Sequence, residues 1–471
     1  MAENIREIAL DTLLTLEREK EYSNRLIKNV LDKYDYLGTR DKAFIKRLTE
    51  GTLERQLELD YYLNQTSAVT VPKMKPFIRC LMRMSLYQIL YMDTVPDSAA
   101  CNEACRLAAK RGFSSLRGFV NAVLRKLSRE KNFLTLPDRE REQAEYLSVK
   151  YSMPRWIVEL WLEEYGMDIA ETLMSALMQI HPVSLRFRTD ITKERQENLC
   201  REIQNAGAVL IKSSYLPYSY TFTGGPSVDR LPGFSEGLFT VQDVSSALAV
   251  VAADIKPKDY VIDPCAAPGG KTLLAAEKAA KVLSRDISAE KTELIRESAE
   301  RMNAGNIRIQ DYDATVEDAA LFETADVVLL DVPCSGLGVI GKKRDIKYRI
   351  TPEDLINLQA LQRRIVNACS KYVKPGGTLL YSTCTINSGE NEEMVRYITD
   401  NLPFIPYPLD ESLPPKLLLD RERVEGLRKE YNRESHVQLN EDERKACIQL
   451  LPGYMEGDGF FIARFCRKQG E

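Results

Sequence analysis

Two cysteines each follow a short apolar run closely: Cys334 in the stretch DVPCSG and Cys384 in the stretch YSTCT. The runs at 325–330 and 378–381 are typical of buried strands in a parallel sheet. If these strands are neighbours, their carboxyl ends lie roughly 5 Å apart laterally, and both thiols face the crevice in which open α/β sheets bind ligands. Because a thiolate is a strong nucleophile, the pair predicts covalent chemistry on an electrophilic ring.

A glycine turn precedes these motifs, in the stretch VIDPCAAPGGKT at 261–272. The pattern predicts a strand, a tight turn and the start of a helix. Gly269 and Gly270 permit backbone conformations that a Cβ would obstruct, and the helix N-terminus offers free N–H groups to an anion. The turn is not a P-loop, which requires glycine where Cys265 stands, and it is not GxGxxG.

Acidic residues end the next two predicted strands. Asp286 lies seventeen residues after Gly269, where a carboxylate can accept hydrogen bonds from two ribose hydroxyls. Asp313 follows the third strand and is expected to meet an adenine. Asp311 is the alternative, because strand ends are predicted only to within a residue or two. A nucleoside with an anionic amino-acid tail, such as S-adenosylmethionine, satisfies the turn and both acids.

The elements around these motifs alternate between strands and helices from about residue 236 onward. Strands are predicted at 260–263, 282–286, 307–310, 327–330, 378–381 and 459–465, and helices at 271–280, 289–302 and 352–372. This alternation of strands and helices predicts a doubly wound parallel sheet. The stretch 411–444 is charged and is expected to be an irregular exposed insertion. His436, which lies within it, is assigned no catalytic role.

The first 127 residues instead show the apolar periodicity of six or seven helices, and between them and the alternating region the composition changes. We therefore predict a multidomain chain: an all-α bundle at 1–135, a small α+β linking domain at 136–235, and an α/β Rossmann-like domain at 236–471.

The net charge of −4 conceals a basic segment. Residues 71–131 contain twelve Lys and Arg but four acids, which leaves a local charge of +8. Such a segment on an acidic chain is typical of a protein that docks on phosphates through one face. The alternative is a merely solvated helix surface.

The composition, with 44% hydrophobic and 28% charged residues, is that of a soluble globular protein. No apolar stretch approaches the ~18 residues that span a bilayer, and the N-terminus lacks the pattern of a signal segment, so a cytoplasmic protein without membrane contact is expected. Ten cysteines without a Cys-x-x-Cys pair, and two histidines, argue against a metal site.

The helical region resembles the NusB antitermination-factor fold. The resemblance covers residues 1 to about 130 and rests on SLYQILYMDTVPDSAA at 85–100, NEA at 102–104 and GFVNAVLRKL at 118–127. It implies an RNA-binding bundle in which the basic segment, and within it Arg125, Lys126 and Arg129, contacts RNA.

The alternating region resembles the RNA cytosine-C5 methyltransferases through DPCAAPGGK at 263–271, DVPCSGLG at 331–338 and YSTCT at 381–385. Together with the NusB-like N-terminal region, the alternating region is similar to the RsmB (Sun/Fmu) family. Members of this family methylate 16S rRNA of the bacterial small ribosomal subunit. The resemblance implies S-adenosylmethionine as cofactor and a monomer that binds small-subunit rRNA, without DNA or metal. The implied cofactor-binding residues are Cys265, Ala266, Ala267, Pro268, Gly269, Gly270, Lys271, Asp286, Asp313 and Asp331.

The resemblance also implies the catalytic roles. Cys384 is the nucleophile that adds to C6 of cytosine, and Cys334 assists product release. Asp331 hydrogen-bonds the base near N3, and Lys271 supports the same electrostatics unless it is a surface lysine at the helix start. The residues alone leave the two cysteines open, because DNA cytosine methyltransferases attack with the Pro-Cys thiol.

Two positions depart from the family pattern: Arg344 stands where proline is expected, and Tyr348 where tryptophan is common. The loop that holds them is still basic, so RNA contact is expected there. Two alternatives to the rRNA methyltransferase hypothesis are the same chemistry on tRNA and a non-catalytic NusB-like RNA-binding factor.

Overall fold

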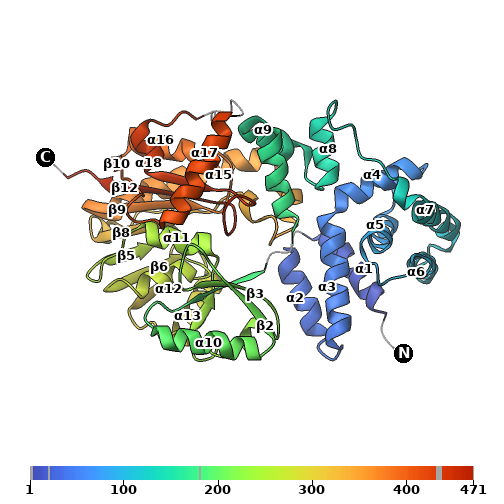
Figure 1. Ribbon diagram of the computed structural model, residues 1–471, viewed down its shortest axis with the longest axis horizontal. Coiled ribbons are helices and arrows are strands. Elements are labelled where there is room, and N and C mark those ends of the chain that lie inside the picture. Colours follow the sequence, from blue (N-terminus) through green and yellow to red (C-terminus); the bar gives the residue numbers. More distant parts are fainter. Residues whose placement is uncertain (1–3, 20–21, 180–181, 431–436, 470–471) are drawn as a thin grey trace. The chain divides into compact units, whose positions relative to one another are not determined.

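The computed structural model describes residues 4–19, 22–179, 182–430 and 437–469. It divides the chain into two compact units (Figure 1). The N-terminal unit comprises Met1–Met178 together with Ile340–Arg349, and the catalytic unit comprises Gln179–Val339 and Ile350–Glu471. The expected linking domain at 136–235 is therefore divided: its residues up to Met178 belong to the first unit, and its residues from Gln179 onward belong to the second.

The N-terminal unit is helical, as the NusB resemblance predicts. Its described helices are α1 (Ile5–Arg18), α2 (Ser23–Lys33), α3 (Thr39–Glu54), α4 (Gln56–Thr66), α5 (Pro76–Tyr91), α6 (Asp97–Lys110), α7 (Arg117–Glu130), α8 (Gln143–Lys150), α9 (Arg155–Leu177) and the short α14 (Ile346–Arg349).

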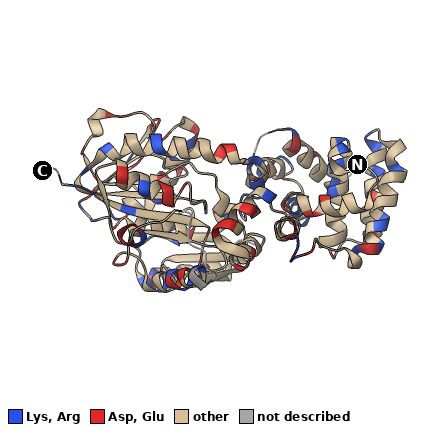
Figure 2. Ribbon diagram, turned by 90° about the horizontal axis from the view of Figure 1, so that it is seen from above, with Lys and Arg blue, Asp and Glu red and all other residues tan. Residues whose placement is uncertain are grey.

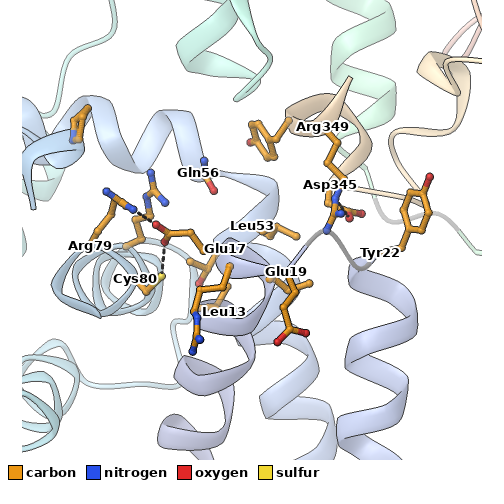
Figure 3. A pocket seen from close by; sticks show the side chains of 16 residues that line it. Leu13, Glu17, Glu19, Tyr22, Leu53, Gln56, Arg79, Cys80, Asp345 and Arg349 are labelled. Carbon is orange, nitrogen blue, oxygen red and sulfur yellow. Dashed lines mark hydrogen bonds and ion pairs between the residues drawn. The ribbon is translucent and has the colours of Figure 1, made fainter. Parts of the chain in front are cut away.

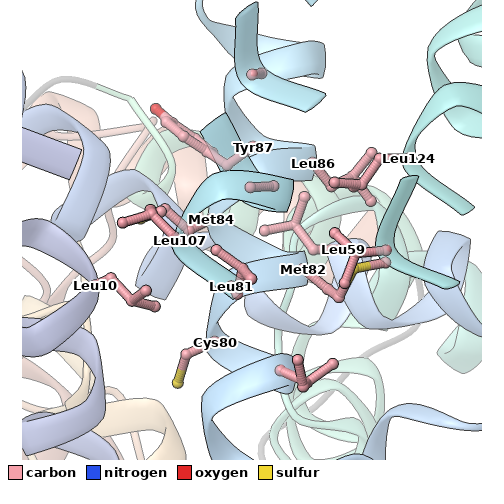
Figure 4. Close-up of a cluster of buried hydrophobic side chains, with 14 of the residues drawn as sticks. Leu10, Leu59, Cys80, Leu81, Met82, Met84, Leu86, Tyr87, Leu107 and Leu124 are labelled. Carbon is pink, nitrogen blue, oxygen red and sulfur yellow. The ribbon is translucent and has the colours of Figure 1, made fainter. Parts of the chain in front are cut away.

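Helix α5 forms the centre of this unit (Figure 4). Most of its residues are buried, among them Leu81, Met82 and Leu86, which are fully enclosed. A helix that is apolar on nearly all sides must be surrounded by others, and each buried leucine stabilises the bundle by about 1.5–3 kcal/mol. Helix α3 approaches α5 closely at Gly51, where a Cβ would collide with the ring of Tyr87.

The segment Ile340–Arg349 packs into the helical unit although its neighbours in sequence belong to the catalytic unit. Arg344 forms ion pairs with Glu50 at 2.6 Å and Glu54 at 3.1 Å. The buried Lys347 donates to the backbone carbonyl of Glu54 at 2.9 Å.

This packing changes the interpretation of the basic loop. Tyr348 shares the Glu54 carbonyl and also contacts Ser152. The expectation that the loop offers its charges to RNA is therefore wrong for Arg344 and Lys347, because protein groups already occupy both side chains.

The catalytic unit begins with a four-stranded antiparallel sheet of order β2-β3-β1-β4. Leu199 and Ile203 of α10 are buried in the same apolar cluster as Leu185 and Phe187 of the sheet. The elements are β1 (Val183–Phe187), α10 (Lys193–Asn205), β2 (Ala208–Lys212), β3 (Ser219–Gly224) and β4 (Phe239–Val241).

A larger sheet forms the core of the catalytic unit, with the strand order β10-β12-β9-β8-β5-β6-β7 and β11 paired to β12. The strands are β5 (Tyr260–Asp263), β6 (Lys281–Asp286), β7 (Ile307–Asp311), β8 (Ala325–Asp331), β9 (Val373–Thr383), β10 (Phe404–Pro406), β11 (Cys447–Leu450) and β12 (Phe460–Arg467). Strands β9, β8, β5, β6 and β7 run parallel, whereas β12 is antiparallel to β9. The sheet is thus mixed, and the predicted parallel order holds for these five strands.

Helices cover this sheet: α11 (Val244–Ala252), α12 (Gly270–Ala276), α13 (Ala289–Arg301), α15 (Pro352–Cys369) and α16 (Glu392–Asn401). The stretch 411–444 is not irregular, because it contains α17 (Pro415–Glu430) and α18 (Glu441–Lys445). Most residues of α17 are strong helix formers, and its Leu417 is fully buried. His436 lies outside the described residues. No helix in the described ranges is long and apolar enough to cross a membrane.

Candidate active site

The strands that precede the two cysteines are parallel neighbours, as predicted. In the register of β8 and β9, Leu330 is opposite Tyr381 and Asp331 is opposite Ser382. Strands β8 and β9 end at the same edge of the sheet, because the carboxyl ends of parallel strands meet there.

The thiols of Cys334 and Cys384 meet beyond this edge, with their Sγ atoms 3.2 Å apart. The hydrogen bond with Cys384, and then burial, raise the pKa of the Cys334 thiol well above its usual range. Cys334 therefore keeps its proton at neutral pH and can donate it toward Cys384.

Lys271 and Asp331 form an ion pair next to the thiols. Lys271 Nζ lies 2.7 Å from Asp331 Oδ2, and Ser382 Oγ donates to Asp331 Oδ1 at 2.9 Å. Only 10% of the Lys271 side chain is exposed, and its ammonium lies 5.0 Å from the centre of the Phe460 ring. Lys271 is thus buried against β8 and β12, and the surface-lysine alternative is wrong.

The glycine turn has the predicted strand–turn–helix form. Gly269 has a φ of 106°, a left-handed conformation that favours glycine, and it directly precedes α12. Its N–H donates to the carbonyl of Ala266 at 2.8 Å. Burial raises the pKa of the Cys265 thiol well above its usual range, so this cysteine remains protonated.

Asp286 is the last residue of β6, and it binds the glycine turn through a hydrogen bond. Its Oδ2 accepts from the N–H of Ala267 at 2.9 Å, and its Oδ1 accepts from the N–H of Ile287 and from Lys291 Nζ at 2.8 and 3.0 Å. The carboxylate is buried at the expected strand end, and its contact with a ribose stays a prediction.

The choice between Asp311 and Asp313 stays open. Asp311 is the last residue of β7, is opposite Asp286 in the sheet and accepts from the hydroxyl of Thr292. Asp313 lies two residues later, where hydrogen bonds from the backbone and side chain of Thr315 lower the pKa of its carboxyl.

Asp263 is a further polar residue of the site that the sequence analysis did not single out. It ends β5, is fully buried, and its Oδ2 accepts from Thr272 Oγ1 at 2.7 Å. Burial raises its pKa to about 7. Its Oδ1 is buried and has no hydrogen-bond partner among the described residues. The signal in the sequence was its position at a strand end directly before the turn.

The predicted RNA-binding residues share the solvent face of α7. Arg125, Lys126 and Arg129 are exposed, whereas Val123, Leu124 and Leu127 are buried. Figure 2 shows basic and acidic residues together in the helical region. Six other basic residues of 71–131 are paired with carboxylates: Arg79, Arg83, Arg106, Lys110, Arg111 and Lys131.

The positive charge of α7 is not neutralised in this way. Lys126 and Arg129 form no ion pair with any described residue, and Arg125 contacts only the amide oxygens of Asn121 and Asn102.

The N-terminal unit also contains a half-open pocket of about 830 Å³ (Figure 3). Four basic and three acidic residues line it, and among them Arg79 pairs with Glu17 and Arg349 pairs with Asp345. None of the predicted site residues lines it. Within the described parts of the chain, no group of three or more His, Cys, Asp or Glu side chains could hold a metal ion.

Comparisons with known proteins agree with this geometry. Residues 250–466 match the model of the family described as 16S rRNA methyltransferase RsmB/F, and residues 3–129 match the NusB family. The chain is 33% identical over 475 aligned residues to the probable ribosomal RNA small subunit methyltransferase B of Bacillus subtilis, covering 99% of each chain. The protein belongs to the ribosomal RNA small subunit methyltransferase B family.

A second member supports this family assignment along nearly the whole chain, and one crystal structure shares the fold. The family member of Synechocystis is 30% identical, with 97% of this chain and 98% of its own covered. The crystal structure of PH0851 shares the fold, with a TM-score of 0.75 and 24% identity over 99% of each chain. Family membership confirms that the protein is a methyltransferase with an N-terminal NusB-type region, and the matched segment 250–466 contains the glycine turn and both cysteines.

Proposed function

We propose that the protein transfers a methyl group from S-adenosylmethionine to C5 of a cytosine in 16S rRNA, through a covalent bond between Cys384 Sγ and C6. The observation that carries this proposal is the 3.2 Å contact between Cys334 Sγ and Cys384 Sγ beside the Lys271–Asp331 ion pair. Neither family membership nor the fold assigns the attacking atom, so its identity rests on this arrangement and on the motif resemblance.

The chemistry explains why two thiols are needed. Carbon 5 of cytosine is a poor nucleophile. Addition of the Cys384 thiolate to C6 breaks the aromaticity of the ring and makes C5 enamine-like, so that it can accept the methyl group. Loss of the C5 proton then lets the electron pair return to the ring and expel the Cys384 sulfur.

Cys334 is assigned to product release, in which the C5 proton is lost and the Cys384 sulfur departs. Its protonated thiol touches Cys384 Sγ, which supports a role in returning a proton to the departing sulfur. In the same concerted elimination the Cys334 sulfur takes up the C5 proton as it gives its own proton to Cys384, so the thiol pair ends with both protons in place.

Asp331 and Lys271 would bind the polar edge of the cytosine. Each oxygen of Asp331 already accepts one hydrogen bond, from Lys271 and from Ser382, and this fixes the carboxyl group at the carboxyl end of β8. The Lys271 ammonium of this pre-oriented pair can stabilise the negative charge that develops on the ring near N3 during attack.

The cofactor would be held by residues 265–271 of the glycine turn and by Asp286 and Asp313. The positive φ of Gly269 supports this assignment, because a turn without a Cβ lets a ligand approach the backbone closely. S-adenosylmethionine would supply the methyl group. RNA would dock on the exposed basic residues of α7, since these charges have no carboxylate partner in the described chain.

A methyl-transfer assay on defined RNAs tests the proposal. The purified full chain is incubated with methyl-labelled S-adenosylmethionine and either 16S rRNA or total tRNA, and bisulfite sequencing locates the product. We expect 5-methylcytosine in 16S rRNA and none in tRNA. Label in tRNA alone would change the substrate, and label on another base would overturn the chemistry. Absence of both S-adenosylmethionine binding by calorimetry and methyl transfer would favour a non-catalytic RNA-binding factor.

A further inference from the structure

The loops that carry the two cysteines are joined by one buried carboxylate, that of Glu390. This residue is 0% exposed and lies just before α16. Its Oε2 accepts from the backbone N–H of Ser335, the residue after Cys334, at 2.9 Å, and its Oε1 accepts from the hydroxyl of Ser335. On the other side, Asn387 Nδ2, three residues after Cys384, donates to Oε1 at 3.1 Å.

Gln362 of α15 completes this Glu390 cluster, which we define as Glu390, Ser335, Asn387 and Gln362. Gln362 Nε2 donates to Glu390 Oε2 at 2.9 Å and to the carbonyl of Pro333 at 3.0 Å. The Cys334 loop is therefore held on both sides of the cysteine, at residues 333 and 335.

Two direct bonds run between the loops as well. The hydroxyls of Ser335 and Thr385 lie 2.7 Å apart, and the N–H of Gly338 donates to the carbonyl of Cys384 at 3.0 Å. The 3.2 Å contact of the sulfurs is thus one of several contacts between the Cys334 loop and the Cys384 loop.

The charge of Glu390 is not neutralised by a cation. No lysine or arginine of the described chain forms an ion pair with it, and its hydrogen-bond donors are neutral groups of Ser335, Asn387 and Gln362. A buried charge without a counter-ion is costly, so fold stability alone gives little reason for a carboxylate at this position. The negative charge also lies close enough to contribute, after the Cys384 contact and burial, to the raised pKa of Cys334.

We propose that Glu390 is a positioning residue for methyl transfer, whose carboxylate holds the Cys334 loop against the Cys384 loop so that the two sulfurs stay in contact. The proposal rests on the proposed function in one respect only: it takes Cys334 to act on the Cys384 sulfur during product release. Glu390 itself does not touch the substrate. Without it, Cys334 is displaced, and release slows more than binding.

Glu390→Gln tests this with little change in shape. We expect kcat to fall about tenfold or more, with KM for RNA and for S-adenosylmethionine within about twofold of the wild type. A covalent RNA–protein adduct should accumulate. Glu390→Asp keeps the charge but shortens the reach, so it should also lose kcat. The matched control is Glu393→Gln, which removes an exposed carboxylate on α16 paired with Arg363 at 3.8 Å and should behave as wild type.

A second measurement does not require activity. The rate at which iodoacetamide alkylates Cys334 is followed by mass spectrometry as a function of pH. Because Glu390→Gln removes a nearby negative charge and loosens the loop, its profile should move to lower pH, whereas that of Glu393→Gln should coincide with the wild type. If the wild type methylates no RNA, the proposed function fails, and this profile still decides the role of Glu390.

Wild-type kcat together with an unchanged Cys334 profile in Glu390→Gln would overturn the proposal. If that variant does not fold, Ser335→Ala replaces it, since it removes one donor and leaves the Ser335 N–H bond in place. It should lower kcat less than Glu390→Gln and leave both KM values unchanged. A Ser335→Ala enzyme with full kcat and a wild-type alkylation profile would then overturn the proposal.

Discussion

The sulfur atoms of Cys334 and Cys384 are in contact, at 3.2 Å, although fifty residues of chain separate them. Each lies beyond the end of its own strand, and β8 and β9 bring them to one edge of the sheet. The Cys384 contact and burial raise the pKa of Cys334 well above its usual range, and the loops of both cysteines are hydrogen-bonded to Glu390. Single substitutions can distinguish the roles of the two thiols.

Removal of the proposed nucleophile should stop the reaction at its first step. We expect Cys384→Ala to lower methyl transfer on the order of 10³-fold or more. Binding of S-adenosylmethionine, measured by calorimetry, should be unchanged, because residues 265–271 are untouched. Full activity in this variant would remove the nucleophile assignment.

Removal of the second thiol should instead block the reaction after attack. In Cys334→Ala we expect a covalent RNA–protein adduct that survives a denaturing gel, because no thiol assists departure of the Cys384 sulfur. The double variant Cys334→Ala/Cys384→Ala is the control and should form no adduct. If the single variant forms none either, Cys334 has no role in release.

Reversal of the exposed charges on α7 should weaken RNA binding. For Arg125→Glu, Lys126→Glu and Arg129→Glu combined, we expect a higher Kd and a flatter dependence of log Kd on log salt. Each lost phosphate contact reduces the slope by about 0.7–0.9. Filter binding at several salt concentrations measures both quantities.

The control for that experiment reverses a similar charge elsewhere. Lys193, Arg201 and Lys212 are exposed on α10 and β2, and their combined change to glutamate alters the net charge by the same amount. If both triple variants lose affinity equally, the effect is one of net charge, and the α7 face has no special role.

The two acids after β7 can be distinguished by single amide substitutions. Asp313→Asn should raise the Kd for S-adenosylmethionine by about tenfold, the effect of one hydrogen bond to a charged group, while Asp311→Asn should leave it near the wild-type value. Calorimetry provides the comparison. The reverse result would assign the adenine contact to Asp311.

The buried Lys347 should make the N-terminal unit sensitive to pH. Burial first, and then the nearby positive charges of Arg55 and Arg344, lower the pKa of Lys347 to about 7. Between about pH 7 and the unfolded value of 10.5, the unfolded chain binds a proton that the folded chain does not. Stability from this residue therefore rises with pH through that window and is lowest below pH 7.

Lys347→Met tests this dependence. It should raise the melting temperature most near pH 6, where the buried ammonium costs at least about 1 kcal/mol, and the gain should shrink toward pH 10. The Glu54 carbonyl keeps the hydroxyl of Tyr348 as a partner. Lys46→Met, at a side chain 57% exposed, is the control and should show no pH-dependent gain. A constant difference across pH for Lys347→Met would contradict the lowered pKa.

Local sequence patterns were sufficient to place most elements of the catalytic unit. Strands β5, β6, β7 and β8 and helix α13 lie within a few residues of their predicted bounds, because apolar periodicity and turn residues act over a few positions. The stretch 411–444 failed the same reasoning. Its charge predicted an irregular loop, yet most residues of α17 are strong helix formers, and Leu417 and Val424 are buried.

The sequence by itself determined the strand–turn–helix around Gly269, the carboxyl-end position of each cysteine and the family to which the motifs belong. These depend on residues close together in the chain. Only the tertiary structure decided that Lys271 meets Asp331, that Ile340–Arg349 packs into the helical unit, and that Glu390 joins the two cysteine loops. Such contacts depend on strand order and loop paths, and residues far apart in sequence carry no local pattern that reveals which of them will touch.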